Sequence, residues 1–196
     1  MKQIEITVRV NNQLNEIDSI LTRQGFRIIR RSRIEDNYKT LEYNNLSKDN
    51  ILNVLSKCVL IRYLNVNNEK EFKKITYKNK IYENNNVISE EKISVNIDDI
   101  NNADKLFEIL GFKTIVNVNY DAIVYSNDKI ELCFQDVEGL GLLLEYENEK
   151  DFDGYASDEI IKEKYKMLDE IKKYNLNITN EIDVKKAYEL IYTKIS

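Results

Sequence analysis

Short segments in which apolar and polar residues alternate recur along this chain, and they constrain its fold more than any other feature. The first runs from Ile4 to Val10, with isoleucine or valine at every second position and Glu5, Thr7 and Arg9 between them. Alternation of this kind is typical of an extended strand with one buried face. Eight such strands are predicted, at about residues 4–10, 26–38, 59–64, 72–78, 88–97, 115–125, 130–135 and 142–147.

Five further segments show the apolar spacing of amphipathic helices. Gly25 and Gly111 follow two of them and are typical helix stop signals. The strands are joined mainly by short polar links, which favours an antiparallel sheet, and the helices are expected to cover its apolar face. The predicted helices lie at about residues 13–24, 47–57, 100–110, 158–174 and 181–195.

These elements predict an α+β fold in a single domain that spans residues 1–196. The second face of the sheet then carries Glu, Arg, Lys, Thr and Asn on every strand. A sheet of eight antiparallel strands can close into a β-barrel with this polar face inside, and the last two helices (about 158–195) are expected to pack on the outside. An open sheet with its polar face in water fits the same periodicity.

Composition excludes several classes of function. The chain contains no histidine, which removes His-dependent catalytic triads and His-ligated zinc sites. Its net charge of −5 argues against binding to nucleic-acid polymers, because phosphate contacts require a basic excess. No segment resembles a signal peptide or a bilayer span, so we expect a cytoplasmic protein with no membrane partner. Cys58 and Cys133 are expected to be reduced.

The stretch from Gln135 to Glu147 combines a turn that contains two glycines with a strand of mixed character. Glu145 and Glu147 share one face of this strand, and apolar residues share the other. Two carboxylates at positions i and i+2 can hold one hard cation such as Mg²⁺ or Mn²⁺. A solvated strand face explains the same pair without a ligand.

Several motifs occur in an order that is found in a known superfamily. They are Glu5-x-Thr7-x-Arg9, Ile61-Arg62-Tyr63-Leu64, Ile75-Thr76-Tyr77-Lys78, Leu110-Gly111-Phe112, Val137-Glu138-Gly139-Leu140-Gly141 with Glu145-x-Glu147, and Ala187-Tyr188-Glu189-Leu190. In these motifs, and over essentially its whole length, the chain resembles the CYTH superfamily. That superfamily comprises class IV adenylyl cyclases and thiamine triphosphatases, which are also called triphosphate tunnel metalloenzymes.

The resemblance implies a closed eight-stranded tunnel that binds a triphosphate-containing small molecule or a polyphosphate together with Mg²⁺ or Mn²⁺. Phosphoryl transfer of this kind needs no histidine, because it depends on positioning, charge neutralisation and metal ions. The resemblance assigns no single catalytic residue. The ligands that it implies are Glu5, Glu145 and Glu147 for the metal, and Arg9, Arg62 and Lys78 for phosphate oxygens.

The chain departs from the family pattern at positions that normally carry charge. Thr7 replaces a Glu, Leu64 replaces an Arg, and Gln135 replaces an Asp. Each lost charge-assisted contact to phosphate removes about 1.5–3 kcal/mol. Lys74 and Lys92 are predicted to replace part of the missing charge, and one or two of Arg30, Arg31 and Arg33 are further candidates.

Two strands leave the identity of their inward residues open. In strand 115–125, an ungapped count places the family's basic pair at Tyr120 and Ala122, but the apolar phase directs Asn119 and Asp121 inward. In strand 88–97, the family's Arg-x-Glu corresponds either to Ser89 and Glu91 or to Glu90 and Lys92. The apolar phase favours the second register.

Three functions remain open at this point. The first is metal-dependent chemistry on a triphosphate, either hydrolysis or adenylyl cyclisation. The second is binding of a nucleotide, polyphosphate or other anion without turnover, which the lost charges favour. The third is a structural domain whose last two helices form a homodimer, and in that case Lys or Arg residues would neutralise Glu145 and Glu147.

Overall fold

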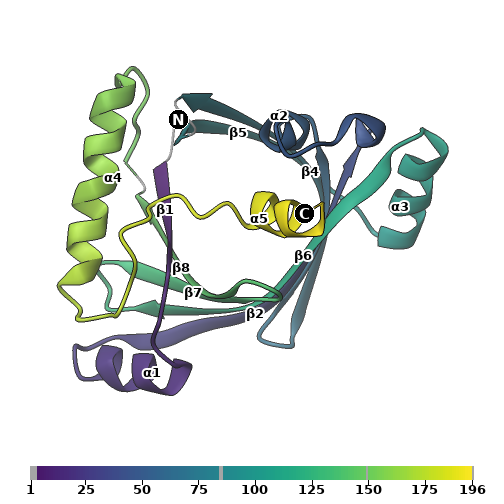
Figure 1. Ribbon diagram of the computed structural model, residues 1–196. Helices are drawn as coiled ribbons and strands as arrows, with labels where there is room; N and C mark the ends of the chain where they lie inside the picture. The colour runs from purple at the N-terminus through teal and green to yellow at the C-terminus, as the bar shows by residue number, and fades with distance from the viewer. Residues whose placement is uncertain (1–3, 84–85, 149, 196) are drawn as a thin grey trace.

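The computed structural model describes residues 4–83, 86–148 and 150–195, and it describes their side chains except for those of residues 78–91. Within these ranges, eight strands form one antiparallel sheet in the order β1-β8-β7-β6-β2-β3-β4-β5 (Figure 1). This confirms the prediction of eight antiparallel strands. The strands are β1 (Ile4–Arg9), β2 (Arg27–Thr40), β3 (Val59–Val66), β4 (Lys70–Glu83), β5 (Asn86–Asn96), β6 (Lys113–Ser126), β7 (Glu131–Val137) and β8 (Gly141–Asn148).

The predicted closure of the sheet into a barrel is wrong. β1 and β5 lie at opposite ends of the strand order, and no ladder in the described part of the chain joins them. The second edge of β1 is hydrogen-bonded to the segment 178–184 instead. The amide of Thr7 donates to the carbonyl oxygen of Ile182 (3.2 Å), and the amide of Val184 donates to the carbonyl oxygen of Thr7 (3.0 Å). Because this segment occupies backbone groups of β1, they are not available to β5.

The five predicted helices are all present. The last one begins at residue 186 rather than at 181, because the segment before it is extended along β1. None of the helices in the described ranges combines the length and apolarity that a bilayer span requires. The helices are α1 (Leu14–Thr22), α2 (Ile51–Leu55), α3 (Ile100–Ile109), α4 (Ser157–Lys172) and α5 (Lys186–Lys194), with a 3-10 helix η1 at Tyr43–Asn45.

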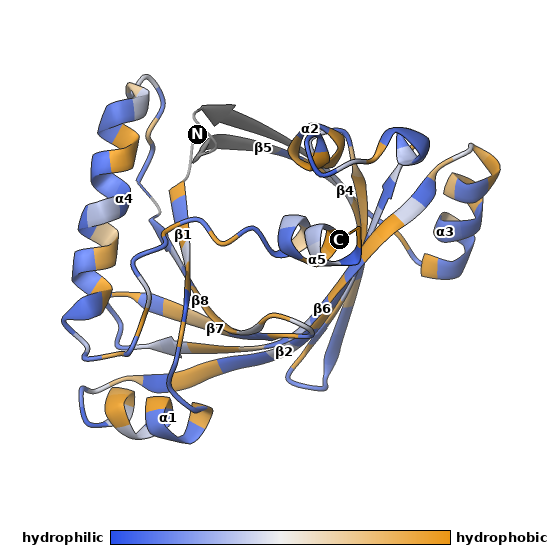
Figure 2. Cartoon of the chain, viewed as in Figure 1, coloured by the Kyte–Doolittle hydropathy of each residue, from blue (hydrophilic) through white to orange (hydrophobic). Residues whose placement is uncertain are grey.

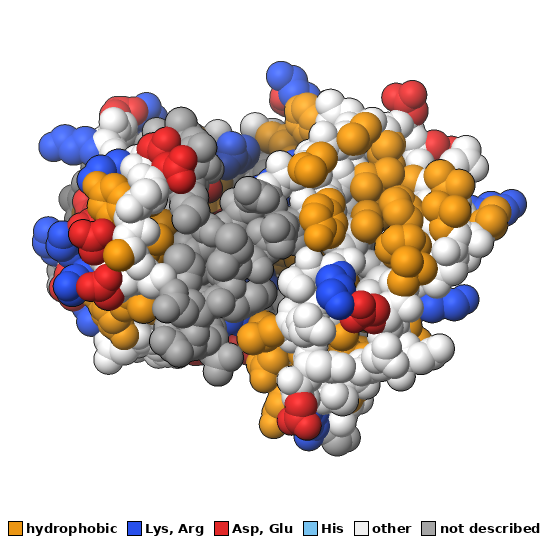
Figure 3. Space-filling view, turned by 90° about the horizontal axis from the view of Figure 1, so that it is seen from above, with side chains coloured by type: hydrophobic (Ala, Val, Ile, Leu, Met, Phe, Trp, Pro, Cys, Tyr) orange, Lys and Arg blue, Asp and Glu red, His pale blue; other side chains and the backbone are white. Residues whose placement is uncertain are grey.

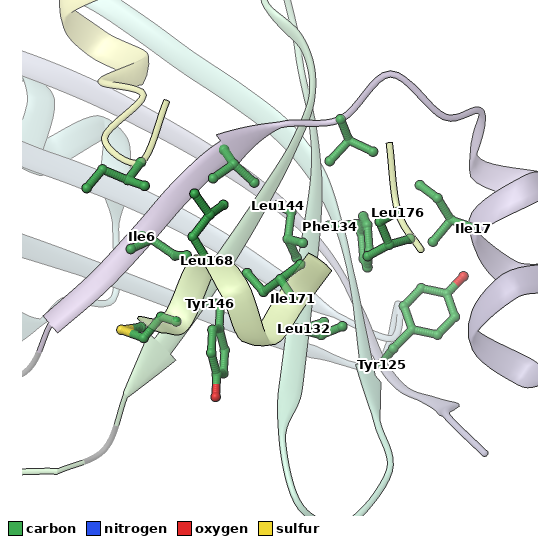
Figure 4. Close-up of a cluster of buried hydrophobic side chains, with 14 of the residues drawn as sticks. Ile6, Ile17, Tyr125, Leu132, Phe134, Leu144, Tyr146, Leu168, Ile171 and Leu176 are labelled. Atoms are coloured by element: carbon green, nitrogen blue, oxygen red, sulfur yellow. The ribbon is translucent and has the colours of Figure 1, made fainter. Parts of the chain in front are cut away.

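One hydrophobic core lies on the convex face of the sheet, under α1 and α4. Ile6 of β1 and Leu144 of β8 meet Leu168 and Ile171 of α4 there (Figure 4), and all four side chains are buried. Hydrophobic and hydrophilic residues alternate along α4 (Figure 2), as expected for a helix with one buried face. Burial of this face fixes which residues of β1 and β8 point to the concave side.

A second core lies on the concave face, where the strands curve around α5 (Figure 1). Ala187 and Ile191 of α5 belong to the same buried cluster as Val118, Tyr120 and Leu143 of the sheet. The expectation of a concave face that is polar on every strand is therefore wrong. Its charged residues lie on the remaining strands and around the N-terminal end of α5.

The phase of β6 also differs from the sequence expectation. Its apolar side chains, including Tyr120 and Ala122, point to the concave face and are buried. Asn119 and Asp121 lie on the opposite face, where Asn119 donates a hydrogen bond to Glu138 (3.2 Å) and Asp121 is exposed. The ungapped count along the family pattern, which gave Tyr120 and Ala122, therefore identifies the inward residues correctly. The apolar phase of the strand, which gave Asn119 and Asp121, does not.

Exposed apolar side chains gather on the half of the molecule that carries α2 and α3 (Figure 3). Leu41, Ile109 and Leu110 are all more than half exposed. Leu41 lies beside Gly111, whose positive φ of 92° ends α3 and turns the chain into β6.

Candidate functional site

The predicted site residues lie on the concave face and form two groups. In the first, β1 pairs with β8 so that Glu5 is opposite Glu147 and Thr7 is opposite Glu145. In the second, Arg62 of β3 is opposite Lys74 of β4, and Lys78 of β4 is opposite Lys92 of β5. We call these groups the carboxylate side (Glu5, Glu145, Glu147) and the lysine side (Arg62, Lys74, Lys92). The side chain of Lys78 is outside the described residues.

Lys186, at the first turn of α5, occupies the carboxylate side. Its Nζ lies 3.1 Å from Oε2 of Glu145 and 2.6 Å from Oε1 of Gln135. The same atom lies 4.9 Å from the centre of the Tyr120 ring, which is a cation–π distance. Lys186 therefore places a cation beside Tyr120, on a strand where the family pattern predicts basic residues.

The surroundings of Lys186 keep it charged. Burial opposes its charge, but the negative field of Glu145, with a smaller effect of Glu5, raises its pKa above the ordinary value of a lysine. Burial also raises the pKa of Tyr120 to about 12, so its hydroxyl is protonated at neutral pH. The pair of Lys186 and Glu145 is therefore an ion pair at neutral pH.

Arg9, predicted to contact phosphate, is held by an acidic residue of α5. Its guanidinium group donates a hydrogen bond to Glu189, and its Nε lies 3.6 Å from a carboxylate oxygen of Glu181. The N-terminal half of α5 thus supplies a cation to a predicted metal ligand and an anion to a predicted phosphate ligand. Both predicted ligands have internal counter-ions.

Arg62 forms a two-pronged ion pair with Asp36 of the neighbouring strand β2. Its Nε and its terminal nitrogen Nη2 each lie 2.5 Å from one carboxylate oxygen. Asp36 is only 3% exposed. Burial opposes the charge of Arg62, but the hydrogen bonds to Asp36 raise its pKa above the usual arginine value. This geometry fixes the plane of the guanidinium group and neutralises part of the charge of Arg62.

Lys74 differs from the other predicted cations. Among the described residues, no hydrogen bond or ion pair involves its ammonium group. Burial lowers its pKa below the ordinary lysine value, and the positive charges of Arg62 and Lys92 lower it further, while Asp36 acts in the opposite direction. The lysine side is therefore a region where cations repel one another, and a bound anion would relieve that repulsion.

Two acids of the carboxylate side are placed where a divalent cation could bind. Glu5 and Glu147 are direct cross-strand partners, so their Cβ atoms are expected to be about 5 Å apart. No three acidic or thiol side chains converge as a metal site among the described residues. A closed protein cage is not required for Mg²⁺, because this ion keeps several waters and binds through one or two carboxylates plus substrate phosphates. Glu5 and Glu147 fit that pattern.

Sequence reasoning missed the two α5 residues that contact the predicted site. Lys186 directly precedes the motif that begins at Ala187, and Glu189 lies within it. Nothing in the apolar spacing of the helix shows which of its polar residues face the sheet. The register that places Lys92 on the face of Lys74 is confirmed by the backbone pairing of β4 with β5. The side chains of Ser89, Glu90 and Glu91 are outside the described residues.

A cleft of about 670 Å³ lies on the opposite, convex face of β2, β3 and β6. Its lining includes Asn37, Tyr63, Asn117 and the start of α3 at Asp99. It contains none of the predicted site residues, so the site is not to be sought there.

No family model matches the sequence. A protein of Methanocaldococcus jannaschii, named "Putative adenylate cyclase MJ0240", is 30% identical over 190 residues, which cover 96% of this chain and 97% of that protein. The similarity therefore extends over both chains nearly from end to end.

Solved structures share the fold at lower identity. The PH1819 protein of Pyrococcus horikoshii superimposes with a TM-score of 0.71 at 22% identity, and the match covers 98% of this chain and 99% of that one. The "putative adenylyl cyclase HpAC1" of Hippeastrum, for which a dominant triphosphatase activity is stated, gives a TM-score of 0.54 at 11% identity over 99% of this chain and 96% of that one.

Proposed function

This chain belongs to the CYTH superfamily, and from that premise we propose that its concave face binds a triphosphate-containing molecule and hydrolyses it with the help of Mg²⁺ or Mn²⁺. The proposal concerns the substrate class, the metal and the roles of individual residues. The proposed substrate is a compact polyanion, because the few cations of the lysine side face one concave surface.

The single observation that carries this proposal is the environment of Lys74. Its ammonium group lies among cations on the concave face, and its pKa is lowered by burial and by Arg62 and Lys92. A structural lysine is normally neutralised by a carboxylate when it is partly buried. Repelling cations on one surface are instead typical of an anion-binding site, where the ligand supplies the missing negative charge.

Phosphate oxygens would contact the lysine side, with Lys74 and Lys92 as point charges and Arg62 as a guanidinium group held in a fixed orientation. Asp36 orients Arg62 and is not a ligand itself. Each charge-assisted contact contributes about 1.5–3 kcal/mol. Lys78 is proposed as a fourth cation from the backbone position that it shares with Lys92.

Glu5 and Glu147 would hold the divalent cation, with Glu145 as a third carboxylate next to them. When bound, such an ion neutralises phosphate charge and lowers the pKa of a water molecule at the reacting phosphorus. The protein contributes the orientation of these carboxylates, which the pairing of β1 with β8 fixes, and the positive field of the lysine side. No histidine is needed for either contribution.

Ligand binding would compete with two internal ion pairs. Lys186 would have to give up Glu145 to a divalent cation bound there, and Glu189 would have to give up Arg9 to a phosphate. Once its carboxylate is taken by the metal, the ammonium group of Lys186 can turn to a phosphate oxygen. In this proposal, α5 changes its ionic contacts during binding without leaving the hydrophobic core that Ala187 and Ile191 anchor.

A second candidate function is anion binding without turnover. The ion pair between Glu145 and Lys186 favours it, because a carboxylate that stays bound to an ammonium group is a poor metal ligand. Adenylyl cyclisation has no specific support among these residues. The two candidates differ in whether a divalent cation can displace Lys186 from Glu145.

The decisive experiment measures phosphate and pyrophosphate release from ATP, thiamine triphosphate and inorganic triphosphate with Mg²⁺ or Mn²⁺. Wild-type protein is compared with Glu147→Gln and with Asp136→Asn as a matched control. Asp136 is an exposed acid on the convex face of β7, two strands from β1. We expect release of orthophosphate that Glu147→Gln reduces by at least about 100-fold, whereas Asp136→Asn retains wild-type rates.

The alternatives give different results in the same assay. If the folded protein binds triphosphate at saturating metal but releases no product, the hydrolysis proposal is wrong and the non-catalytic binding function takes its place. Pyrophosphate and a cyclic nucleotide as products would replace it by cyclisation. Equal rates in Glu147→Gln and the control would remove Glu147 from the metal site.

A further inference from the structure

The cleft on the convex face is built from two rows of paired residues in the sheet and from the start of α3. Directly paired residues point to the same face of a sheet, so the two rows form a continuous floor. The cleft volume of about 670 Å³ lies in the range of small-molecule sites. The first row consists of Asn119, Glu35 and Tyr63, and the second consists of Asn117, Asn37 and Ile61.

The charged groups of this floor already have internal partners. Lys73 is the one basic residue among the described residues that line the cleft. Its ammonium group donates a hydrogen bond to a backbone carbonyl of Asp98 (3.4 Å) and lies 4.0 Å from a carboxylate oxygen of Glu71. The carboxylate of Glu35 lies 3.5 Å from Nε of Arg33. The cleft therefore has no spare cation to attract an anion, which distinguishes it from the lysine side.

The carboxamide groups of the cleft are less occupied. In the part of the chain that the structure describes, no hydrogen bond involves the side chains of Asn101 and Asn117. Asn37 donates a hydrogen bond through Nδ2 to Asp104 of α3 (2.9 Å), and this contact fixes the orientation of its amide. Its Oδ1 is buried and accepts no hydrogen bond from a described residue, which is unfavourable. A ligand that enters between β2 and α3 could supply the missing donor.

These groups suit hydroxyl groups better than any other ligand group. A carboxamide both donates and accepts hydrogen bonds in one plane, and two neighbouring hydroxyl groups of a ring can do the same in return. The hydroxyl group of Tyr63 is bonded to Glu71 (2.7 Å), so the ring of Tyr63 and the buried Ile61 offer apolar surface to the carbon atoms of such a ligand.

We propose that the convex cleft binds a neutral ring compound with neighbouring hydroxyl groups, of the pentose or hexose class. Asn37, Asn101 and Asn117 hydrogen-bond to its hydroxyl groups, and the carboxylate of Asp98 is a further acceptor. This inference goes beyond the proposed function and does not depend on it. The cleft shares no residue with the carboxylate side or the lysine side and lies on the opposite face of the sheet.

The test is a titration of ¹⁵N-labelled protein with D-ribose and D-glucose, followed by the NMR signals of the asparagine side-chain amides. Cyclohexanol, which has one hydroxyl group, and the cation spermidine are the comparison ligands. Asn117→Ala is compared with Asn53→Ala, an exposed asparagine of α2 outside the cleft. We expect one of the sugars to shift the cleft amides with a dissociation constant that Asn117→Ala raises about fivefold and Asn53→Ala leaves unchanged.

Every other result overturns the proposal. Cleft amides that do not shift in folded wild-type protein, with either sugar at up to about 100 mM, would show that no sugar binds there. Equal effects of Asn117→Ala and Asn53→Ala would place the binding elsewhere. Cyclohexanol binding as tightly as the sugars would show an unspecific apolar contact, and binding of spermidine alone would show that the cleft takes a cation. None of these results affects the proposed function.

Discussion

The two sides of the concave surface carry charge in opposite ways. On the carboxylate side, the acid Glu145 and the base Arg9 both have partners that α5 supplies, Lys186 and Glu189. On the lysine side, Arg62 is paired with Asp36, whereas the ammonium group of Lys74 lies among further cations and forms no ion pair with a described residue. One side is neutralised by the chain itself, and the other accumulates positive charge. We therefore expect an anion to bind at the lysine side before it binds at the carboxylate side.

The largest expected effect comes from removing the carboxylate that holds Arg62. Asp36→Ala leaves a guanidinium group largely buried beside Lys74 without its partner, and we expect it to lower the free energy of unfolding by about 3–5 kcal/mol. Urea unfolding followed by circular dichroism measures this change. Asp121→Ala, an exposed acid on β6, is the control and should cost less than about 1 kcal/mol.

This result bears directly on the comparison of the two sides. A loss below about 1 kcal/mol in Asp36→Ala would mean that Arg62 does not depend on its internal partner. Arg62 would then be as available to an external anion as Lys74, and the lysine side would be more positive than the contacts indicate.

The next effect concerns Lys74 and the affinity for inorganic triphosphate. Lys74→Gln removes the cation that a ligand would neutralise, and we expect the dissociation constant to rise about tenfold. Lys73→Gln is the matched control, since Lys73 directly precedes Lys74 in the chain and lies on the convex face near Asp98. Calorimetric titration measures the dissociation constant for inorganic triphosphate in both variants. Equal values in the two variants would show that Lys74 does not contact the ligand.

The pH dependence of binding sharpens the same prediction. The pKa of Lys74 lies below the ordinary value of 10.5 because burial and neighbouring cations disfavour its charged form. A bound anion favours the charged form of Lys74 and raises its pKa, so binding is accompanied by proton uptake. The affinity for the anion therefore falls as the pH rises through the pKa that Lys74 has in the unbound protein. Titrations in buffers of different ionisation enthalpy measure this uptake, which Lys74→Gln should abolish.

The smallest effect is expected on the carboxylate side. Lys186→Gln removes the ammonium group that competes for Glu145, so Mg²⁺ should bind about fivefold more tightly, a change of about 1 kcal/mol. Lys185→Gln is the control, because the ammonium group of Lys185 donates a hydrogen bond to the backbone carbonyl of Asp183 and forms no ion pair with a described residue. Weaker Mg²⁺ binding in Lys186→Gln would show instead that Lys186 orients Glu145 for the metal.

Much of the fold follows from local sequence patterns. Alternation in Ile4–Val10 and similar segments predicts all eight strands, and amphipathic spacing predicts the five helices. Closure was predicted wrongly, because the partner that takes the second edge of β1 is the segment 178–184, far away in the chain. Such a segment has no strand-length alternation that would reveal the pairing. Edge contacts of this kind are set by tertiary packing, which local periodicity does not encode.

The site was predictable only in part. Strand phase places Glu5, Arg62 and Lys74 on one face, and the backbone pairing agrees with that placement. Strand phase gives the wrong inward residues for β6. The apolar face of β6 was expected to point away from the concave side, but a second core under α5 buries Tyr120 and its neighbours there. The charge partners were not predictable at all. Contacts such as that of Lys186 with Glu145 depend on how a distant helix is seated.

The contact of β1 with the segment 178–184 has a consequence for folding during synthesis. β1 is made first, but both of its hydrogen-bonding neighbours, β8 and this segment, come more than 130 residues later in the chain. Strand pairing over such separations is slow, because a long loop must close before any contact forms. While a ribosome is still translating the middle of the chain, Ile4, Ile6 and Val8 have no sheet to join. The N-terminal strand therefore cannot complete its pairing until β8 and the segment 178–184, which follows α4, have been synthesised.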